Sequence, residues 1–164
     1  MPVKDEIRAA NEQYANAFAK GHLPMPPGRR FAVVTCMDAR LDPARFLGLE
    51  EGDAHVIRNA GGLVTDDALR SLVISHWLLG TQEAVVVAHE DCGMLTFSND
   101  DLRAKLAEET GEDASSVDFH PFADLDESVR SSVRRIRDYP LLPDSYDAHG
   151  FVYDVRTGVL REVG

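Results

Sequence analysis

"FAVVTCMDARLDP", residues 31–43, begins with an apolar run of strand-forming residues and then places Cys36, Asp38 and Arg40 at alternate positions. A second valine-rich run, "AVVVA", occupies residues 84–88. Neither run alternates apolar with polar residues, which is typical of parallel strands that are covered on both faces. The stretch "AHVIRNAGG" at 54–62 indicates a third strand that ends at Gly61 and Gly62. These runs predict the centre of a parallel sheet.

Helical signals lie between and after these strands. Thr65 or Asp66 is suited to cap a helix that runs through Leu79, and Gly80 is its expected stop. The inner stripe of that helix is expected to consist of Leu69, Leu72, Val73, His76 and Leu79. Further helices are expected at about 99–109 and 126–138, and residues 151–163 are typical of a hairpin around Thr157-Gly158. Strands that alternate with helices predict an α/β fold with a mainly parallel central β-sheet flanked by helices.

The N-terminal segment has a different pattern. Its apolar residues recur at three- and four-residue spacing and form one stripe on a helix of about 18 residues: Val3, Ile7, Ala10, Tyr14 and Phe18. A stripe that broad needs a surface to cover it, and we expect another subunit to provide it. We therefore expect one domain over residues 1–164, with an N-terminal dimerisation helix in 1–20 and an α/β core over 28–164.

Composition limits the classes of function. A formal net charge of -11 and a pI near 4.9 disfavour nucleic acid and anionic membranes as partners. No stretch approaches the roughly 18 consecutive apolar residues of a membrane span, and no apolar signal region follows the start, so we expect a cytoplasmic protein. Two cysteines without an export signal make a poor disulfide scaffold, which directs attention to thiolate chemistry.

Both cysteines follow valine-rich strands. In "AVVVAHEDCGM", residues 84–94, the strand leads directly to His89 and Cys92, as the first strand leads to Cys36. The carboxyl ends of parallel strands open onto the same crevice, so these three side chains can meet there. Two thiolates and one imidazole suit Zn²⁺, and three protein ligands leave one tetrahedral position for water, as in catalytic zinc sites. A histidine or Asp38 could instead close that position.

Asp38 and Arg40 supply a polar pair beside this group. A bidentate Arg40–Asp38 pair would keep the carboxylate ionised, lower its pKa and direct its free oxygen towards a water molecule. Taken singly, each feature has an ordinary interpretation as a buried core cysteine or a surface ion pair. The joint pattern favours a metal site. The other histidines do not share this context: His22, His55, His76, His120 and His149, of which His120 and His149 lie near loops and could be proton shuttles.

Four stretches together resemble β-class carbonic anhydrases of the short bacterial and archaeal type. They are "CMDAR" at 36–40, "RNAGG" at 58–62, "TDDALRSL" at 65–72 and "HEDCGM" at 89–94. The resemblance implies a carbonate dehydratase, a zinc lyase that hydrates CO₂ reversibly to bicarbonate and a proton through attack by zinc hydroxide. Cys36, His89 and Cys92 would bind one Zn²⁺ per chain. Asp38 would accept a hydrogen bond from the hydroxide, and Arg40 would orient Asp38.

The resemblance carries further expectations. Asp38 is expected to become a fourth zinc ligand in a closed, inactive state when the Asp–Arg pair breaks. The family also implies a homodimer, or a tetramer built from dimers, in which the N-terminal helix reaches over the partner and the sites lie at the interface.

Alternatives to CO₂ hydration remain at this point. Relatives on the same scaffold hydrolyse carbonyl sulfide or carbon disulfide, and the motifs do not separate these substrates. A non-catalytic zinc or redox protein is a further alternative. A nucleotide-binding module is disfavoured, because neither glycine-rich phosphate-binding motif occurs in the chain.

Overall fold

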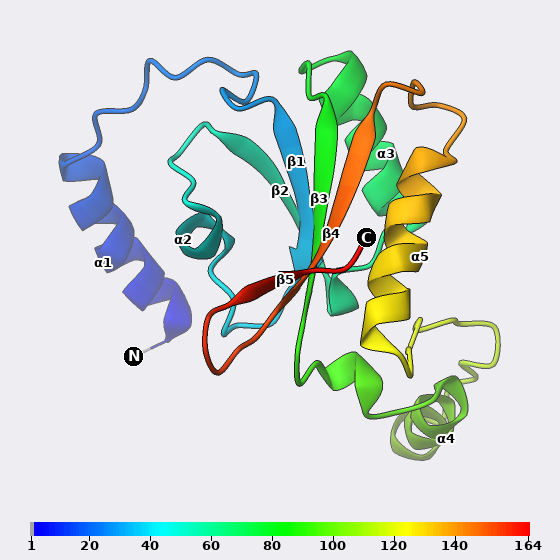
Figure 1. The fold of residues 1–164 in the computed structure, drawn as a ribbon. Coiled ribbons are helices and arrows are strands. Elements are labelled where there is room, and N and C mark those ends of the chain that lie inside the picture. The colour runs from blue at the N-terminus through cyan, green and yellow to red at the C-terminus, as the bar shows by residue number, and fades with distance from the viewer. Residues whose placement is uncertain (1) are drawn as a thin grey trace.

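A computed structural model describes residues 2–164 and contains one five-stranded sheet (Figure 1). The strands are β1 (Phe31–Cys36), β2 (Ala54–Asn59), β3 (Glu83–His89), β4 (Asp147–Tyr153) and β5 (Leu160–Glu162). Their order is β2-β1-β3-β4-β5, and all neighbours are parallel except β4 and β5, which form an antiparallel pair. The predicted α/β class, the three strands and the C-terminal hairpin are confirmed.

Five α-helices accompany the sheet in this part of the chain: α1 (Val3–Asn16), α2 (Pro43–Leu47), α3 (Asp66–Trp77), α4 (Asn99–Thr110) and α5 (Leu125–Arg137). Two short 3-10 turns, η1 (Ala60–Gly62) and η2 (Gly93–Leu95), follow β2 and β3. Thr65 caps α3, because its hydroxyl accepts a hydrogen bond from the amide of Ala68 at 3.3 Å. The helix ends at Trp77, so the expected end at Leu79 is two residues too far along the chain.

The helices cover the two faces of the sheet unequally. On one face, α3 and α5 pack against β1, β3 and β4 around a large apolar core that includes Val34, Leu72 and Ile136. On the other face, α2 and the C-terminal hairpin cover Val33 and Val87. All six residues of β1 are buried, as its unbroken apolar run predicts. The inner stripe expected for α3 is buried at Leu69 and Leu72 and only partly buried further along, where Ser75 is buried instead.

Helix α1 stands apart from the sheet at the edge nearest β2 (Figure 1). The Tyr14 hydroxyl of α1 donates to Glu51 at 2.6 Å, and Lys20, which follows the helix, pairs with the same carboxylate. None of its described residues is buried, and its apolar stripe is exposed in the single chain, with Val3 and Ile7 at 70% and 62% of their full accessibility. The helix has 14 residues and ends at Asn16, so it is shorter than the expected helix of about 18 residues, and Phe18 lies beyond its end. The exposed stripe is available for an intermolecular contact.

Among residues 2–164, the structure holds no helix with the length and apolar character needed to cross a membrane.

Candidate metal centre

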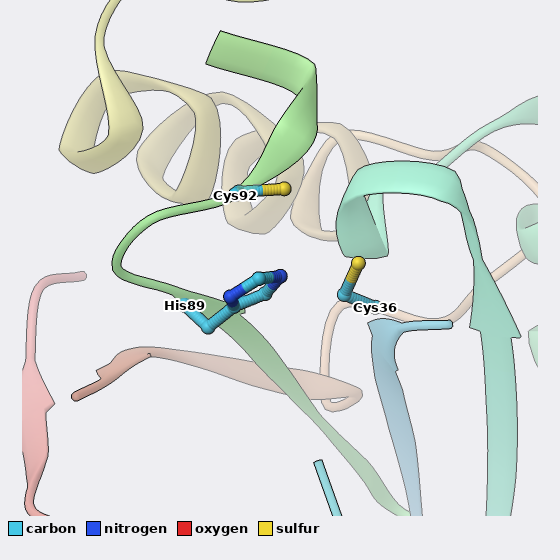
Figure 2. Close-up of side chains that lie close together, drawn as sticks. All are labelled: Cys36, His89 and Cys92. Carbon is cyan, nitrogen blue, oxygen red and sulfur yellow. The ribbon is translucent and has the colours of Figure 1, made fainter. Parts of the chain in front are cut away.

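The site forms where two neighbouring strands end. β1 and β3 pair in parallel register, and Cys36 and His89 are the last residues of these strands. The hydroxyl of Thr35, just before Cys36, donates to the carbonyl of Val87 at 2.8 Å and ties the two strands together close to their ends. Cys92 follows His89 after a short turn. Figure 2 shows the three side chains converging, and one ligand atom from each lies within 4.8 Å of the others.

His89 is fully buried and is already oriented for a metal ion. Its Nδ1 lies 2.8 Å from the carbonyl oxygen of Glu90, so Nδ1 carries the proton and donates it, which leaves a lone pair on Nε2. Nε2 is a buried polar atom without a hydrogen-bond partner in the described part of the chain. Burying an unpaired polar atom is costly, and a cation at this position would satisfy it. The histidine therefore fits a metal site.

The two thiols are buried and differ in acidity. A hydrogen bond from the Cys92 thiol lowers the pKa of Cys36; burial opposes this effect, and His89 reinforces it. The same shared hydrogen bond, together with burial, raises the pKa of Cys92. The two sulfurs therefore lie in contact, and a cation bound between them would hold both as thiolates. Two thiolates and a neutral imidazole are the donor set that Zn²⁺ accepts.

Two glycines bring the backbone after β2 against this group. Gly62 has φ 64°, and a Cβ at this position would lie 2.8 Å from the amide nitrogen of Cys36. Gly61, with φ 85°, has its amide hydrogen-bonded to the Cys36 sulfur, which helps to lower the pKa of that thiol. The "RNAGG" stretch therefore supports the first cysteine through its backbone.

Asp38 and Arg40 form the bidentate pair that the sequence predicts. The Nε and Nη2 atoms of Arg40 donate to the two carboxylate oxygens of Asp38 at 3.0 and 2.8 Å, and the amide of Arg40 adds a third bond at 2.9 Å. These bonds hold the pKa of Asp38 well below its usual range. One carboxylate oxygen lies 3.8 Å from His89 Nε2. An ionised acceptor therefore stands beside the three candidate ligands.

Sequence reasoning missed two residues that hold these loops. Arg58, on β2, donates to the carbonyl oxygens of Cys36 at 2.9 Å and Asp38 at 2.7 Å. Asp91, in the turn between His89 and Cys92, accepts from Nη1 of Arg40 at 2.8 Å. Both contacts depend on how separate loops fold towards each other. Arg58 lies in the "RNAGG" stretch and Asp91 in the "HEDC" stretch. These stretches were the available signals, but neither indicates which atoms the two side chains contact.

A small hollow opens at the group. Its volume is about 180 Å³, and apolar side chains and glycines supply most of its lining: Cys36, Met37, Asp38, Ala60, Gly61, Cys92, Gly93 and Met94.

Three of the remaining histidines contact residues outside this group. His55 contacts the Ser75 hydroxyl at 2.7 Å, His76 the Thr81 carbonyl at 2.6 Å and His120 the Asp118 carboxylate at 3.2 Å. Within the described residues, the group of side chains that could hold a metal ion is Cys36, His89 and Cys92.

Comparisons with known proteins agree with this geometry. Residues 31–160 match the model of the family described as "Carbonic anhydrase". The chain is 52% identical over 164 residues to β-carbonic anhydrase 1 of Mycobacterium tuberculosis, covering 99% of each chain. It is also 37% identical over 175 residues to a carbon disulfide hydrolase of Acidianus sp., covering 92% of this chain and 84% of that one.

A solved structure gives the same result at the level of the fold. The crystal structure of carbonic anhydrase from Streptococcus mutans superposes with a TM-score of 0.96 at 48% identity, covering 100% of this chain and 99% of the other. The likeness extends over the whole described chain, including the sheet edge that carries the Cys–His–Cys group. The chain therefore belongs to the β-carbonic anhydrase family.

Proposed function

We propose that this chain catalyses the reversible hydration of CO₂ to bicarbonate and a proton. The observation that carries the proposal is the buried Cys36–His89–Cys92 group, with an unpartnered Nε2, beside a carboxylate held ionised by an arginine. Carbonic anhydrases of this family use zinc, and the three side chains are suited to hold one metal ion. When bound there, Zn²⁺ would lower the pKa of a water molecule so that it can act as a nucleophile near neutral pH.

The residues around the group have separate tasks in this proposal. Asp38 accepts a hydrogen bond from the attacking water and so directs an oxygen lone pair towards the carbon of CO₂. Arg40 keeps that carboxylate ionised and fixes its orientation through the two parallel bonds. The Glu90 carbonyl fixes the tautomer of His89, which leaves Nε2 free for the metal.

The hollow supports a small, uncharged substrate. Its lining has no charged side chain apart from Asp38 and the two cysteines, and its volume of about 180 Å³ accommodates a linear triatomic molecule together with several water molecules. Met37 and Met94 offer polarizable apolar contact on which CO₂ can lie.

A second candidate reaction is the hydrolysis of carbon disulfide or carbonyl sulfide on the same site. The favouring observation is the 37% identity to a carbon disulfide hydrolase, which is lower than the 52% identity to a β-carbonic anhydrase. The deciding experiment measures kcat/KM for CO₂, carbonyl sulfide and carbon disulfide on one zinc-loaded preparation. We expect CO₂ to be the preferred substrate, and a higher kcat/KM for either sulfur compound would replace the main proposal with this one.

We further propose a homodimer in which α1 packs on the partner subunit, and a cytoplasmic location. The exposed apolar stripe of α1 supports the first, because a single chain leaves it in water. The two unpaired thiols support the cytoplasmic location, since a reducing compartment keeps thiol ligands available for a metal.

In this proposal residues 28–164 form the catalytic core, and Asp38 is the fourth zinc ligand of a closed state. Crystal structures across a pH series would test that last point, and an Asp38 that kept its Arg40 contacts at every pH would contradict it.

A further inference from the structure

The guanidinium of Arg40 is held by two loops. Its Nε and Nη2 donate to Asp38 at 3.0 and 2.8 Å. Its third nitrogen, Nη1, donates to the Asp91 carboxylate at 2.8 Å, and Nη2 also donates to the Asp91 carbonyl at 3.1 Å. All three guanidinium nitrogens therefore donate hydrogen bonds. Asp91 accepts from Nη1, the nitrogen that does not contact Asp38.

Asp91 is well placed to connect the two halves of the site. It lies in the turn between His89 and Cys92, whereas Arg40 and Asp38 belong to the loop that follows Cys36. Its φ is 58°, a left-handed conformation that aspartate and asparagine adopt more readily than most other side chains. In this conformation the same residue offers both a carboxylate and a carbonyl oxygen to Arg40. The contact spans the loops that carry all three candidate ligands.

The contribution of this contact to folding is expected to be small. The side chains of Asp91 and Arg40 are 65% and 47% exposed, and ion pairs with that much solvent contribute little to stability. Its expected effect is on the position of the Arg40 side chain. Arg40 has a long flexible side chain, and a second anchor on its far side restricts the positions in which it can hold Asp38. Resting on the proposed function, we propose that Asp91 is a positioning residue that fixes Arg40 and, through it, Asp38.

Two substitutions test this role with residues that tolerate the positive φ of position 91. Asp91→Gly removes the carboxylate and tolerates positive φ, whereas Asp91→Asn keeps an oxygen acceptor and also tolerates it. In the zinc-loaded protein, Asp91→Gly should lower kcat for CO₂ hydration by about 10-fold or more with little change in KM, and Asp91→Asn should retain most of the activity. Asp67→Ala is the control outside the site, because it removes the carboxylate of another exposed Asp–Arg pair with the same 2.8 Å distance.

A double-mutant comparison separates positioning from other effects. In an Arg40→Ala background, Asp91→Gly should cause no further loss of kcat, since its partner is already absent. A loss of equal size in that background, loss of zinc from Asp91→Gly, or parental kcat in Asp91→Gly would each overturn the proposal.

A readout independent of turnover keeps the two proposals distinguishable. The Nε–H of Arg40 should exchange slowly with solvent in heteronuclear NMR spectra of the zinc-loaded parent and rapidly in Asp91→Gly. If the parent does not hydrate CO₂, the proposed function fails, whereas this comparison still decides whether Asp91 fixes Arg40. Equal exchange in the two proteins would overturn the positioning role.

Discussion

Asp38 combines in one side chain the charge, the orientation and the proximity to the ligand group on which catalysis would depend. Replacing it with asparagine keeps its size but removes the ionised acceptor. We expect Asp38→Asn to lower kcat for CO₂ hydration by about 100-fold or more, in the range typical of a positioned proton acceptor. Stopped-flow hydration with metal analysis on the same sample checks this. Zinc should remain near one ion per chain, and parental activity in the Asp38→Asn variant would refute the assigned role.

Gly62 makes a second residue-level test possible, because the chain contains a matched partner for it. Gly48 and Gly62 have nearly equal φ values of 61° and 64°, but only at Gly62 would a Cβ meet backbone atoms, those of Thr35 and Cys36. Replacement of Gly48 by Ala should cost about 1 kcal/mol of unfolding free energy for the left-handed backbone alone.

Gly62→Ala should cost more than Gly48→Ala, because the end of β1 must shift as well. The shift should also weaken metal binding, since it moves the backbone of a candidate ligand. Chemical denaturation and competitive zinc titration of both variants measure these effects. Equal losses of stability with unchanged zinc affinity would show that the close approach at Gly62 does not support the site.

The residues that the sequence could identify are those whose chemistry and position in a strand both carry information. Cys36, His89 and Cys92 follow buried strands, and parallel strands place their ends at one edge. Asp38 and Arg40 lie two and four residues after a cysteine, so their contact is local. Arg58 and Asp91 could not be assigned in this way, because their partners lie 20 to 51 residues away in the chain and are brought near by loop geometry.

At the level of elements, the buried strands were the most predictable parts and short helices the least. β1 and β3 carry uninterrupted valine-rich runs, which are typical of parallel strands covered on both faces. α2 escaped prediction because its five residues are too few to display a helical period, although Asp42 caps it and Pro43 begins it. The end of α3 was placed too late, since apolar residues continue through Leu78 and Leu79 after the helix has stopped.

Helix α1 gives the prediction that belongs to this scale. If its apolar stripe packs on a partner, a charge placed there should weaken the dimer. We expect Ile7→Glu to shift the molar mass measured by light scattering towards the single chain at low concentration. Ala9→Glu puts the same side chain nearly on the opposite face of the helix and serves as the control. A stable Ile7→Glu dimer would remove α1 from the interface.

On the scale of the whole molecule, many carboxylates have lowered pKa values, and this determines whether the unfolding free energy rises or falls as the pH is lowered. Asp38, Asp91, Asp126 and Glu127 are all held below their usual pKa by arginines. A carboxyl whose pKa is lower in the folded chain stabilises it above the unfolded pKa of about 4, and this contribution is lost as the pH falls towards the folded value. The unfolding free energy should therefore decrease below about pH 4.

Urea denaturation at several pH values measures this slope. Asp126 provides a control away from the candidate site, because both of its oxygens accept from Arg161, at 3.0 and 2.8 Å. Asp126→Asn should make the loss of stability on acidification shallower. If the parent were equally stable at neutral and acidic pH, the lowered pKa values would have no thermodynamic effect.

The central claim is that a metal held by Cys36, His89 and Cys92 makes this chain a carbonic anhydrase. The most direct test is the rate of CO₂ hydration by one preparation as isolated, after removal of its metal with a chelator, and after addition of one equivalent of Zn²⁺. We predict a fast initial rate, its loss with the metal and its return with zinc. A rate unaffected by metal removal, or no hydration by protein that contains zinc, would contradict the account.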